Sequence, residues 1–210
     1  MYLTLTWLAH IQPAGGVVKD QVIIVPFNPS AAGSSGVAGA WKDDFMDCTR
    51  FGIFHPSFIM ACCCPLILLG QVMTRLNLDW LGNSAPSGEW TQTFRKMVYI
   101  SVAYVILCLL LSPADPQNPP SPLYNLVNFV YAVFMIYLLM RVRKLVRDQG
   151  QIPETRCIGC EDLCCAAFCG CCTVSQLARQ TANYNCDDEA HFFTPDGLPP
   201  SSRTAPDITV

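Results

Sequence analysis

The sequence has few charged residues and lacks them altogether in three long stretches. Only 14% of its 210 residues are Asp, Glu, Lys or Arg, whereas 51% are hydrophobic. A soluble domain of this length would distribute its apolar residues at helical or strand periods, but here they are gathered in blocks. The net charge of −3, with no basic stripe, also argues against a nucleic-acid partner. The composition therefore favours a membrane protein.

Several motifs that would identify other protein classes are also missing. The chain has no Walker sequence, no G-x-G-x-x-G and no nucleophile elbow, so we expect no enzymatic activity. Residues 1–15 have neither a basic n-region nor a clear apolar h-region, and the triplet at Asn28 is blocked as a glycosylation acceptor by Pro29. We therefore expect no secretory signal peptide there, and cysteines that face a reducing compartment.

The first apolar block, residues 51–70, carries no formal charge and is long enough to cross a bilayer. Pro56 and Pro65 interrupt it, because each removes a backbone donor and clashes with the preceding helical turn. We therefore predict a broken, interfacial or re-entrant pair of short helices here, in preference to a full span.

The second and third apolar blocks, residues 97–112 and 123–140, predict a transmembrane hairpin. Both are uncharged, and the ten residues 113–122 between them contain five prolines, so the chain must turn there. Apolar segments of this length must be helical in lipid, where backbone groups find no other partner. Asn125 and Asn128 are expected to support helix association. The alternative interpretation is a soluble protein with two buried core helices.

Basic residues flank both outer ends of the hairpin, whereas its turn carries only Asp115. They are Arg95 and Lys96 before the first helix and Arg141, Arg143, Lys144 and Arg147 after the second. By the positive-inside rule, this pattern predicts cytosolic termini and a turn on the opposite side of the membrane. Residues 141–150 are expected to continue the helix, and their basic side chains either contact anionic lipid head groups or simply anchor the helix end. We expect a multi-pass protein of the plasma membrane.

Of the 13 cysteines, seven lie between Cys157 and Cys172. Two C-x2-C pairs in this segment have the spacing of zinc ligands and could close one tetrahedral site. The candidate ligands are Cys157, Cys160, Cys169 and Cys172. Two alternatives stay open. Cys165, Cys169 and Cys172 fall at i, i+4 and i+7 on one predicted helical face, where S-acylation is common, or the thiols are merely buried or clustered.

A larger pattern includes these cysteines. The segment ends in Cys-x2-Cys-x3-Gln-x2-Arg after an upstream Asp, and a Trp, a Cys, a Cys-Pro and a Gly-Gln precede it. The matching residues are Trp41, Cys48, Cys64, Pro65, Gln71, Asp162, Cys169, Cys172, Gln176 and Arg179. Over residues 41–180 the pattern resembles the placenta-specific-8 Cys-rich family, which includes plant cadmium-resistance and cell-number-regulator proteins.

One departure from that family pattern concerns its Cys-Cys-x4-Cys-Pro-Cys element. It would require cysteines at Phe58, Ile59 and Leu66, whereas this chain has the triplet 62–64. Because Cys-Pro-Cys is the element tied to cadmium resistance in plant members, its loss weakens a transfer of that activity to this chain.

The resemblance implies a non-enzymatic membrane protein with two candidate functions. One is metal-ion handling or transport as a homo-oligomer, since a single hairpin is too small to enclose a path. The other is a membrane scaffold or a regulator of cell number or growth that docks cytosolic partners, which the lack of intramembrane charge favours. The expected fold is an α-helical membrane protein with a two-helix hairpin, a Pro-broken apolar segment and cytosolic Cys-rich segments. Residues 41–180 form the membrane domain, and residues 1–40 and 181–210 are expected to be disordered.

Overall fold

A computed structural model describes residues 39–45, 47, 56–85, 89–113, 119–155, 158–182 and 194–197. All the regular elements in these residues are helices, as predicted, and the one extended pairing among them is an isolated bridge between Leu78 and Ser84. The helices are α1 (Pro56–Cys63), α2 (Pro65–Arg75), η3 (Glu89–Gln92), α3 (Thr93–Leu111), α4 (Pro122–Gly150), α5 (Glu161–Phe168) and α6 (Gly170–Thr181). Cys48, Cys157 and most of both predicted disordered regions lie outside the described residues.

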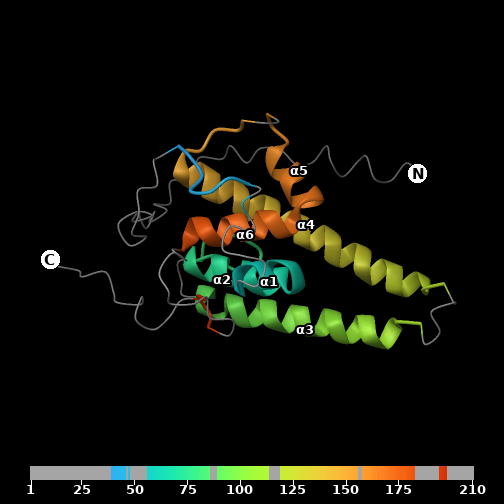
Figure 1. Cartoon of the computed structure of the whole chain (residues 1–210). Helices are drawn as coiled ribbons and strands as arrows, with labels where there is room; N and C mark the ends of the chain where they lie inside the picture. The colour runs from blue at the N-terminus through green and yellow to red at the C-terminus, as the bar shows by residue number, and fades with distance from the viewer. Residues whose placement is uncertain are drawn as a thin grey trace.

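Helices α3 and α4 lie side by side and project together beyond the other helices (Figure 1). Both are long and apolar enough to cross a membrane, with mean hydropathies of 1.9 and 1.8 over their most apolar windows. Their projecting part exposes large apolar side chains, among them Leu109, Leu110 and Phe129 at 72%, 75% and 66%. A soluble protein rarely exposes so continuous an apolar surface. The two predicted spans are therefore confirmed as candidates by length and composition.

Helix α4 continues past its apolar block without a break. It begins at Pro122, where the missing N–H costs nothing, and the Ser121 hydroxyl accepts a hydrogen bond from the Tyr124 N–H at 3.2 Å. It ends where Gln151 adopts a left-handed conformation, at φ 52° and ψ 35°. The predicted helical continuation over residues 141–150 is thus confirmed, and one rigid helix joins the hairpin to the remaining helices.

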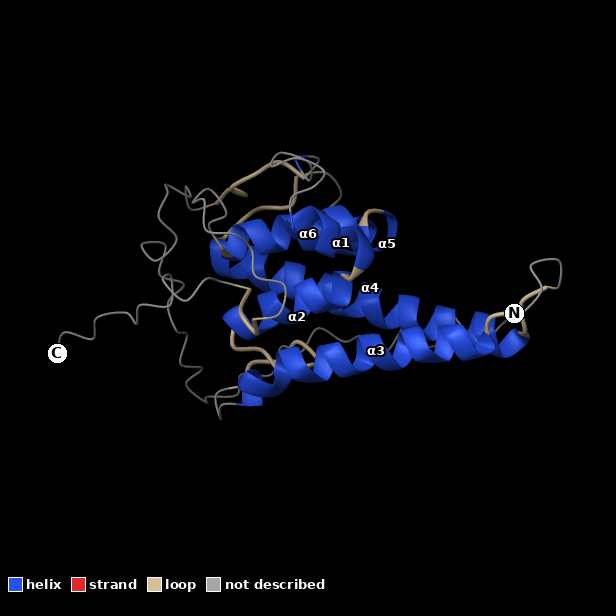
Figure 2. Cartoon of the chain, turned by 60° about the horizontal axis from the view of Figure 1, so that its bottom comes forward, coloured by secondary structure: helices blue, strands red, loops and turns tan. Residues whose placement is uncertain are grey.

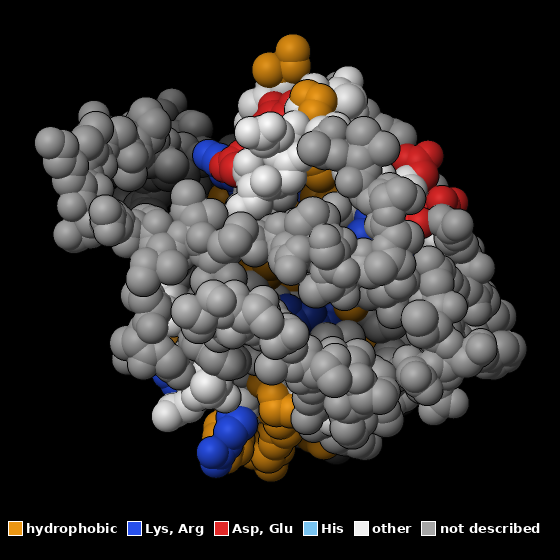
Figure 3. Space-filling view, turned by 90° about the vertical axis from the view of Figure 1, so that its left-hand side faces the viewer, with side chains coloured by type: hydrophobic (Ala, Val, Ile, Leu, Met, Phe, Trp, Pro, Cys, Tyr) orange, Lys and Arg blue, Asp and Glu red, His pale blue; other side chains and the backbone are white. Residues whose placement is uncertain are grey.

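Helices α2, α5 and α6 pack against α4, and α2 also packs against the start of α3; α1 packs against α2 and α6. Together they form a unit that we call the head (Figure 2). Its core is apolar and tightly closed. The core includes Leu66, Leu69, Val72, Met73, Met97, Leu138, Val142, Val174, Leu177 and Ala178, all fully buried. Helices α2 and α3 meet at Gly70, where an added Cβ would lie 2.9 Å from the Met97 Cβ. In contrast to the hairpin, the end of the head opposite the turn presents acidic and basic side chains at its surface (Figure 3).

The head contains two similar helix–cysteine–helix units. Cys64 separates α1 from α2 with φ −138° and ψ 56°, and Cys169 separates α5 from α6 with φ −136° and ψ 53°. The first pair of helices is bent by 119°, and α2 begins at Pro65 as a helix N-terminus allows. The predicted break in the first apolar block is therefore confirmed, and we refer to Cys64 and Cys169 as the two bends.

The break at Cys169 corrects one prediction. Cys165, Cys169 and Cys172 do not share one helical face, because α5 ends before Cys169 and α6 begins after it. The hydroxyl of Thr173 donates to the carbonyl oxygens of Cys165, at 2.8 Å, and of Cys169, at 3.0 Å. This side chain thus bonds a carbonyl at the end of α5, as Ser and Thr often do where a helix bends.

Each unit also holds a non-helical segment through the same residue type. Gln71 and Gln176 both stand seven residues after the Cys of their bend. The amide of Gln71 donates to the carbonyl of Thr194 at 3.0 Å, and that of Gln176 donates to the carbonyl of Asp43 at 3.2 Å. The two family glutamines therefore have equivalent roles. Gln71 holds residues 194–197 against α2, and Gln176 holds residues 39–45 against α6.

Candidate functional site

Arg143 on α4 is the centre of a buried charge network in the head. It is a charged side chain, yet only 2% of its surface is exposed. Its guanidinium donates to the Gln176 side-chain oxygen and lies 3.3 Å from a Glu161 carboxylate oxygen. The Asp162 carboxylate completes the arrangement at 3.2 Å from Nε, an ion pair without hydrogen-bond alignment. Arg143 therefore joins α4 to both α5 and α6.

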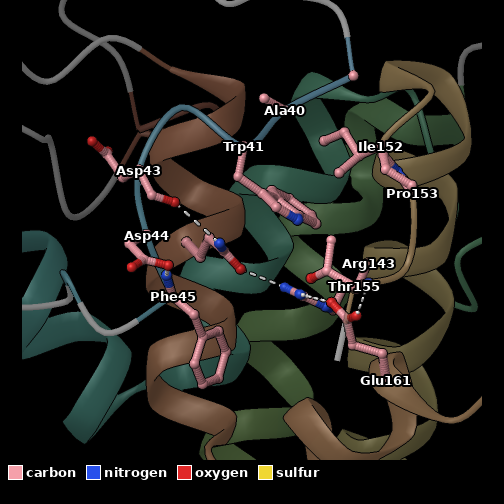
Figure 4. A pocket seen from close by; sticks show the side chains of 12 residues that line it. Ala40, Trp41, Asp43, Asp44, Phe45, Arg143, Ile152, Pro153, Thr155 and Glu161 are labelled. Carbon is pink, nitrogen blue, oxygen red and sulfur yellow. Dashed lines mark hydrogen bonds and ion pairs between the residues drawn. The ribbon is translucent and has the colours of Figure 1, made fainter. Parts of the chain in front are cut away.

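Two aromatic rings cover the same guanidinium. Its central carbon lies 4.5 Å from the centroid of the Trp41 ring and 5.6 Å from that of Phe45. A cation over an aromatic face is stabilised by the ring's quadrupole, more strongly when water is excluded. The segment 39–45 thus covers the network from outside, as the close view of Trp41, Phe45 and Arg143 shows (Figure 4).

Arg147, one helical turn further along α4, extends the network. Its guanidinium lies 2.7 Å from Asp162 and 2.8 Å from Glu154. Glu161 has a second role, because its other oxygen accepts the Thr155 backbone N–H at 2.9 Å. The acidic pair at the start of α5 therefore fixes that helix and the loop before it onto α4.

Arg179 on α6 forms the third part of the network. It is 3% exposed, and it pairs with the Asp43 carboxylate at 3.1 Å while donating to the Ser175 hydroxyl at 2.6 Å. The backbone N–H of Lys42 also donates to the Gln180 side chain at 2.9 Å. Residues 39–45 are consequently held along α6 by several polar contacts at once.

A cleft of about 400 Å³ lies between residues 39–45 and the loop 152–155. Trp41, Asp44 and Phe45 form one wall, Ile152 and Pro153 another, and Arg143 and Glu161 lie at its base (Figure 4). The polar groups at the base already bond one another. The cleft thus provides no set of convergent, unused ligands.

Four of the family residues identified from the sequence meet in this network. Trp41, Asp162, Gln176 and Arg179 come from three different parts of the chain, and Arg143 or Asp43 contacts each of them. Cys64 and Pro65 instead form the first bend, Cys169 forms the second, and Gln71 binds Thr194. Cys172 lies on α6. The pattern therefore marks residues that build the head.

The candidate zinc ligands are not brought together in the part of the chain that the structure describes. Cys160 is disulfide-bonded, in contrast to the expectation that the cysteines face a reducing compartment, and so offers no thiolate to a metal in this state. Cys157 lies outside the described residues. Cys169 occupies the second bend and Cys172 lies on α6. Among the described residues, no group of three or more His, Cys, Asp or Glu is placed to hold a metal ion.

The basic residues after the hairpin fall into two groups. Arg143 and Arg147 were assigned to lipid contact or helix anchoring, but both side chains lie inside the head because carboxylates on α5 pair with them. For these two residues that assignment is wrong. Arg141 is partly exposed, and it donates to Tyr137 at 2.8 Å and Asn83 at 2.9 Å, while Lys144 is exposed.

The sequence analysis missed Arg143, Glu161 and Asp43 as the partners of the family residues. A signal was present, since Arg143 and Arg147 stand four residues apart and share one face of a helix. The acidic pair Glu161–Asp162 follows after a short connection. Complementary charges on neighbouring helices predict an ion-pair network, but their burial is visible only in the fold.

The fold and network define a helical, cysteine-rich protein with two candidate membrane-spanning helices. A model of the PLAC8 family matches residues 41–180, and the chain belongs to this family. The resemblance identified from the sequence is thereby confirmed over the same residues. No curated protein and no solved structure matches the chain.

Proposed function

We propose that this chain is a non-enzymatic membrane scaffold whose hairpin holds a rigid helical head at the cytosolic face, where it docks cytosolic partners. The proposal rests on where the side chains of four residues of the family pattern lie. Trp41, Asp162, Gln176 and Arg179 are engaged inside the head, so they stiffen a surface and line no path along the hairpin.

The geometry of the hairpin supports this placement. The 19 residues of α3 extend about 28 Å, close to the roughly 30 Å hydrocarbon thickness of a bilayer. Exposed basic residues lie at the head end, where Arg95 and Lys144 are exposed to solvent or lipid head groups. This arrangement fits cytosolic termini by the positive-inside rule. Lipid contact through Arg141 and Lys144 forms part of the proposal.

Soft-metal handling by a homo-oligomer is a second candidate, and one observation favours it. Cys63, Cys64 and Cys171 are exposed thiols outside any disulfide, and thiolates prefer Zn²⁺ or Cd²⁺ to Ca²⁺ or Mg²⁺. A path for ions would require several hairpins, because one pair of helices cannot enclose it. The apolar outer faces of α3 and α4 would then contact other copies.

Topology provides the first test. A glycosylation acceptor in an enlarged 113–122 turn should be modified, whereas one placed after residue 200 should not. Modification of the tail alone would reverse the orientation and remove the cytosolic docking surface from the proposal.

Partner capture separates the two functions. A photo-crosslinking residue at the exposed head position Gln149 should capture soluble cytosolic proteins, and one at Leu110 on the hairpin should capture lipid or a second copy. In parallel, purified protein in liposomes is assayed for Zn²⁺ and Cd²⁺ content and flux. Flux that disappears on Cys63→Ser/Cys64→Ser/Cys171→Ser substitution, with no soluble partner at Gln149, would favour metal handling over the scaffold.

A further inference from the structure

Helices α1 and α5, which end at the first and the second bend, lie on the side of the head from which the hairpin projects. Helices α1 and α5 are nearer to the hairpin turn than α2 is, in both orientations of the molecule (Figures 1 and 2). Two proximities relate the bends to positions along α4. Cys64 is close enough to the Tyr131 hydroxyl to interact with it electrostatically, and a Cβ on Gly170 would lie 3.6 Å from a Leu139 methyl carbon.

These proximities give the approximate level of each bend along α4. Tyr131 and Leu139 precede Arg141 by ten and two residues, or about 15 and 3 Å at the helical rise. Basic residues at the end of a spanning segment mark the polar edge of the bilayer. If the hairpin spans the membrane, Cys169 lies near that edge and Cys64 lies beside the apolar part of α4.

Thiols at both bends are accessible. Cys63, Cys64 and Cys171 are exposed and are not disulfide-bonded. Exposed apolar side chains accompany them, Ile59 at 38% on α1 and Phe168 at 84% beside Cys169. Exposed thiols and exposed apolar side chains thus occur together next to both bends.

The neighbouring thiols of α5 differ. Cys164 and Cys165 are each partly buried, and burial raises the pKa of the Cys165 thiol, which lowers its thiolate fraction at neutral pH. Because the thiolate is the nucleophile, Cys165 is the less reactive group. These two cysteines serve as a matched control within the same segment.

We propose that Cys63, Cys64 and Cys171 are sites of S-acylation by long-chain fatty acids, whose chains enter the bilayer beside the hairpin. The proposal deepens the membrane-scaffold function and rests on the placement of the hairpin in the bilayer. The acyl chains cover the exposed apolar side chains of α1 and of the second bend. They thereby attach the head to the membrane at positions additional to α3 and α4.

The reaction is an exchange of one thioester for another. The cysteine sulfur forms a bond to the acyl carbon of a long-chain acyl-coenzyme A, and the bond from that carbon to the coenzyme A sulfur breaks. The cysteine proton ends on the released coenzyme A thiol. No electrons are transferred, so no oxidant or reductant is required.

The test counts thioesters on the full-length protein from cell membranes. Free thiols are blocked, thioesters are cleaved with hydroxylamine, and the released thiols are labelled with a polyethylene-glycol maleimide of known mass. The wild-type chain should gain up to three tags that depend on hydroxylamine. Cys63→Ser/Cys64→Ser/Cys171→Ser should lose them, and Cys164→Ser/Cys165→Ser should retain them. Incorporation of an alkyne fatty acid should follow the same pattern.

Two further measurements keep the outcome clear. Resistance to extraction by alkaline carbonate shows whether the hairpin spans the membrane. If the triple variant loses its tags but resists extraction, lipid anchoring and membrane spanning are separate properties. Extraction of the wild type would count against the scaffold function itself. Retained protease resistance of the head excludes misfolding. Absence of tags on the wild type, tags confined to Cys164 and Cys165, or zinc bound by unacylated Cys63, Cys64 and Cys171 would each overturn the proposal.

Discussion

The two halves of α4 differ in where they place apolar and charged side chains. In the half that belongs to the hairpin, Leu126 and Phe129 are 56% and 66% exposed. In the half that belongs to the head, Arg143 and Arg147 are 2% and 8% exposed. A single helix therefore has apolar groups outside at one end and charges inside at the other. Each end has the arrangement that suits a different surrounding medium, lipid for the first and protein for the second.

The contrast predicts that the two halves respond differently to substitution. Charged groups buried in the head are compensated by fixed partners, and removal of one partner leaves the others desolvated and unpaired. In the hairpin, lipid resembles the side chains it surrounds, so helix contacts there add little free energy. Stability effects should therefore be large around Arg143 and small around Asn128.

The largest effect is expected from Arg143→Leu. It leaves Glu161, Asp162 and Gln176 without their common partner, and a broken buried ion pair typically costs about 3–5 kcal/mol. The head should unfold at a clearly lower temperature or be cleaved by protease under native conditions in mild detergent. The adjacent Lys144→Leu is the matched control, because Lys144 is exposed and its replacement should change stability little. Equal stability of the two variants would show that the network contributes nothing to the head.

A smaller effect is expected at the contact between the head and the base of the hairpin. Gly70→Ala places a methyl group 2.9 Å from the Met97 Cβ, and over-packing of this kind costs about 1–3 kcal/mol. Gly170→Ala is the control, since its Cβ meets only Leu139 at an ordinary 3.6 Å and alanine favours the helix. Thermal unfolding should separate the two variants. Destabilisation by Gly170→Ala as great as by Gly70→Ala would contradict the close approach of α2 and α3.

The same contrast between hairpin and head explains which parts of the fold could be predicted from the sequence alone. The hairpin could be predicted because the absence of charge over a bilayer's length is a local property of the sequence. The break at Pro65 could also be predicted, because proline alone interrupts the helical hydrogen bonds there. The equivalent break at Cys169 was missed, because Thr173 and the packing of α6 on α4 decide it and no Pro marks it. Local periodicity instead suggested one continuous helix.

The candidate site was found in part. Trp41, Asp162, Gln176 and Arg179 were identified by their resemblance to a family pattern, which carries no information on what they contact. The pairing of Arg143 with an acidic pair on another helix depends on how α5 and α6 fold back along α4. Spacing along the chain also suggested the four-cysteine zinc site, which stays a prediction because Cys157 lies outside the described residues. Spacing could not show that Cys169 serves as a bend.

Within the hairpin, Asn128 and Asn125 should have separable roles. The Asn128 side-chain oxygen accepts the Tyr104 hydroxyl at 2.8 Å, a bond between α3 and α4 of one chain, whereas Asn125 is exposed. Asn128→Leu should loosen the hairpin by roughly 0.6–1 kcal/mol, the usual range for such bonds in membranes. Asn125→Leu should leave the hairpin intact and weaken any oligomer. Engineered disulfide rates between α3 and α4 report the first effect, and cross-linking between copies reports the second. Identical behaviour of both variants in both assays would show that neither has a distinct role.

The smallest effect is expected at Asp79, in the turn where the head meets the hairpin. Partial burial opposes ionisation of Asp79, but bonds from the Asn83 N–H at 2.8 Å, the Asn83 side chain and the Leu81 N–H hold its pKa below its ordinary value. The folded state therefore binds fewer protons at this group than the unfolded state does, and its contribution to stability is present above the ordinary carboxyl pKa of about 4. This contribution is lost as the pH falls through the lowered pKa.

Asp79→Asn should thus be slightly less stable than the wild type near pH 7, and the difference in unfolding midpoint should shrink as the medium is acidified below pH ~4. The difference between the two proteins isolates this turn, because they are identical at every other residue. A difference that stays constant across this range would show that the turn is held by its backbone and not by the carboxylate.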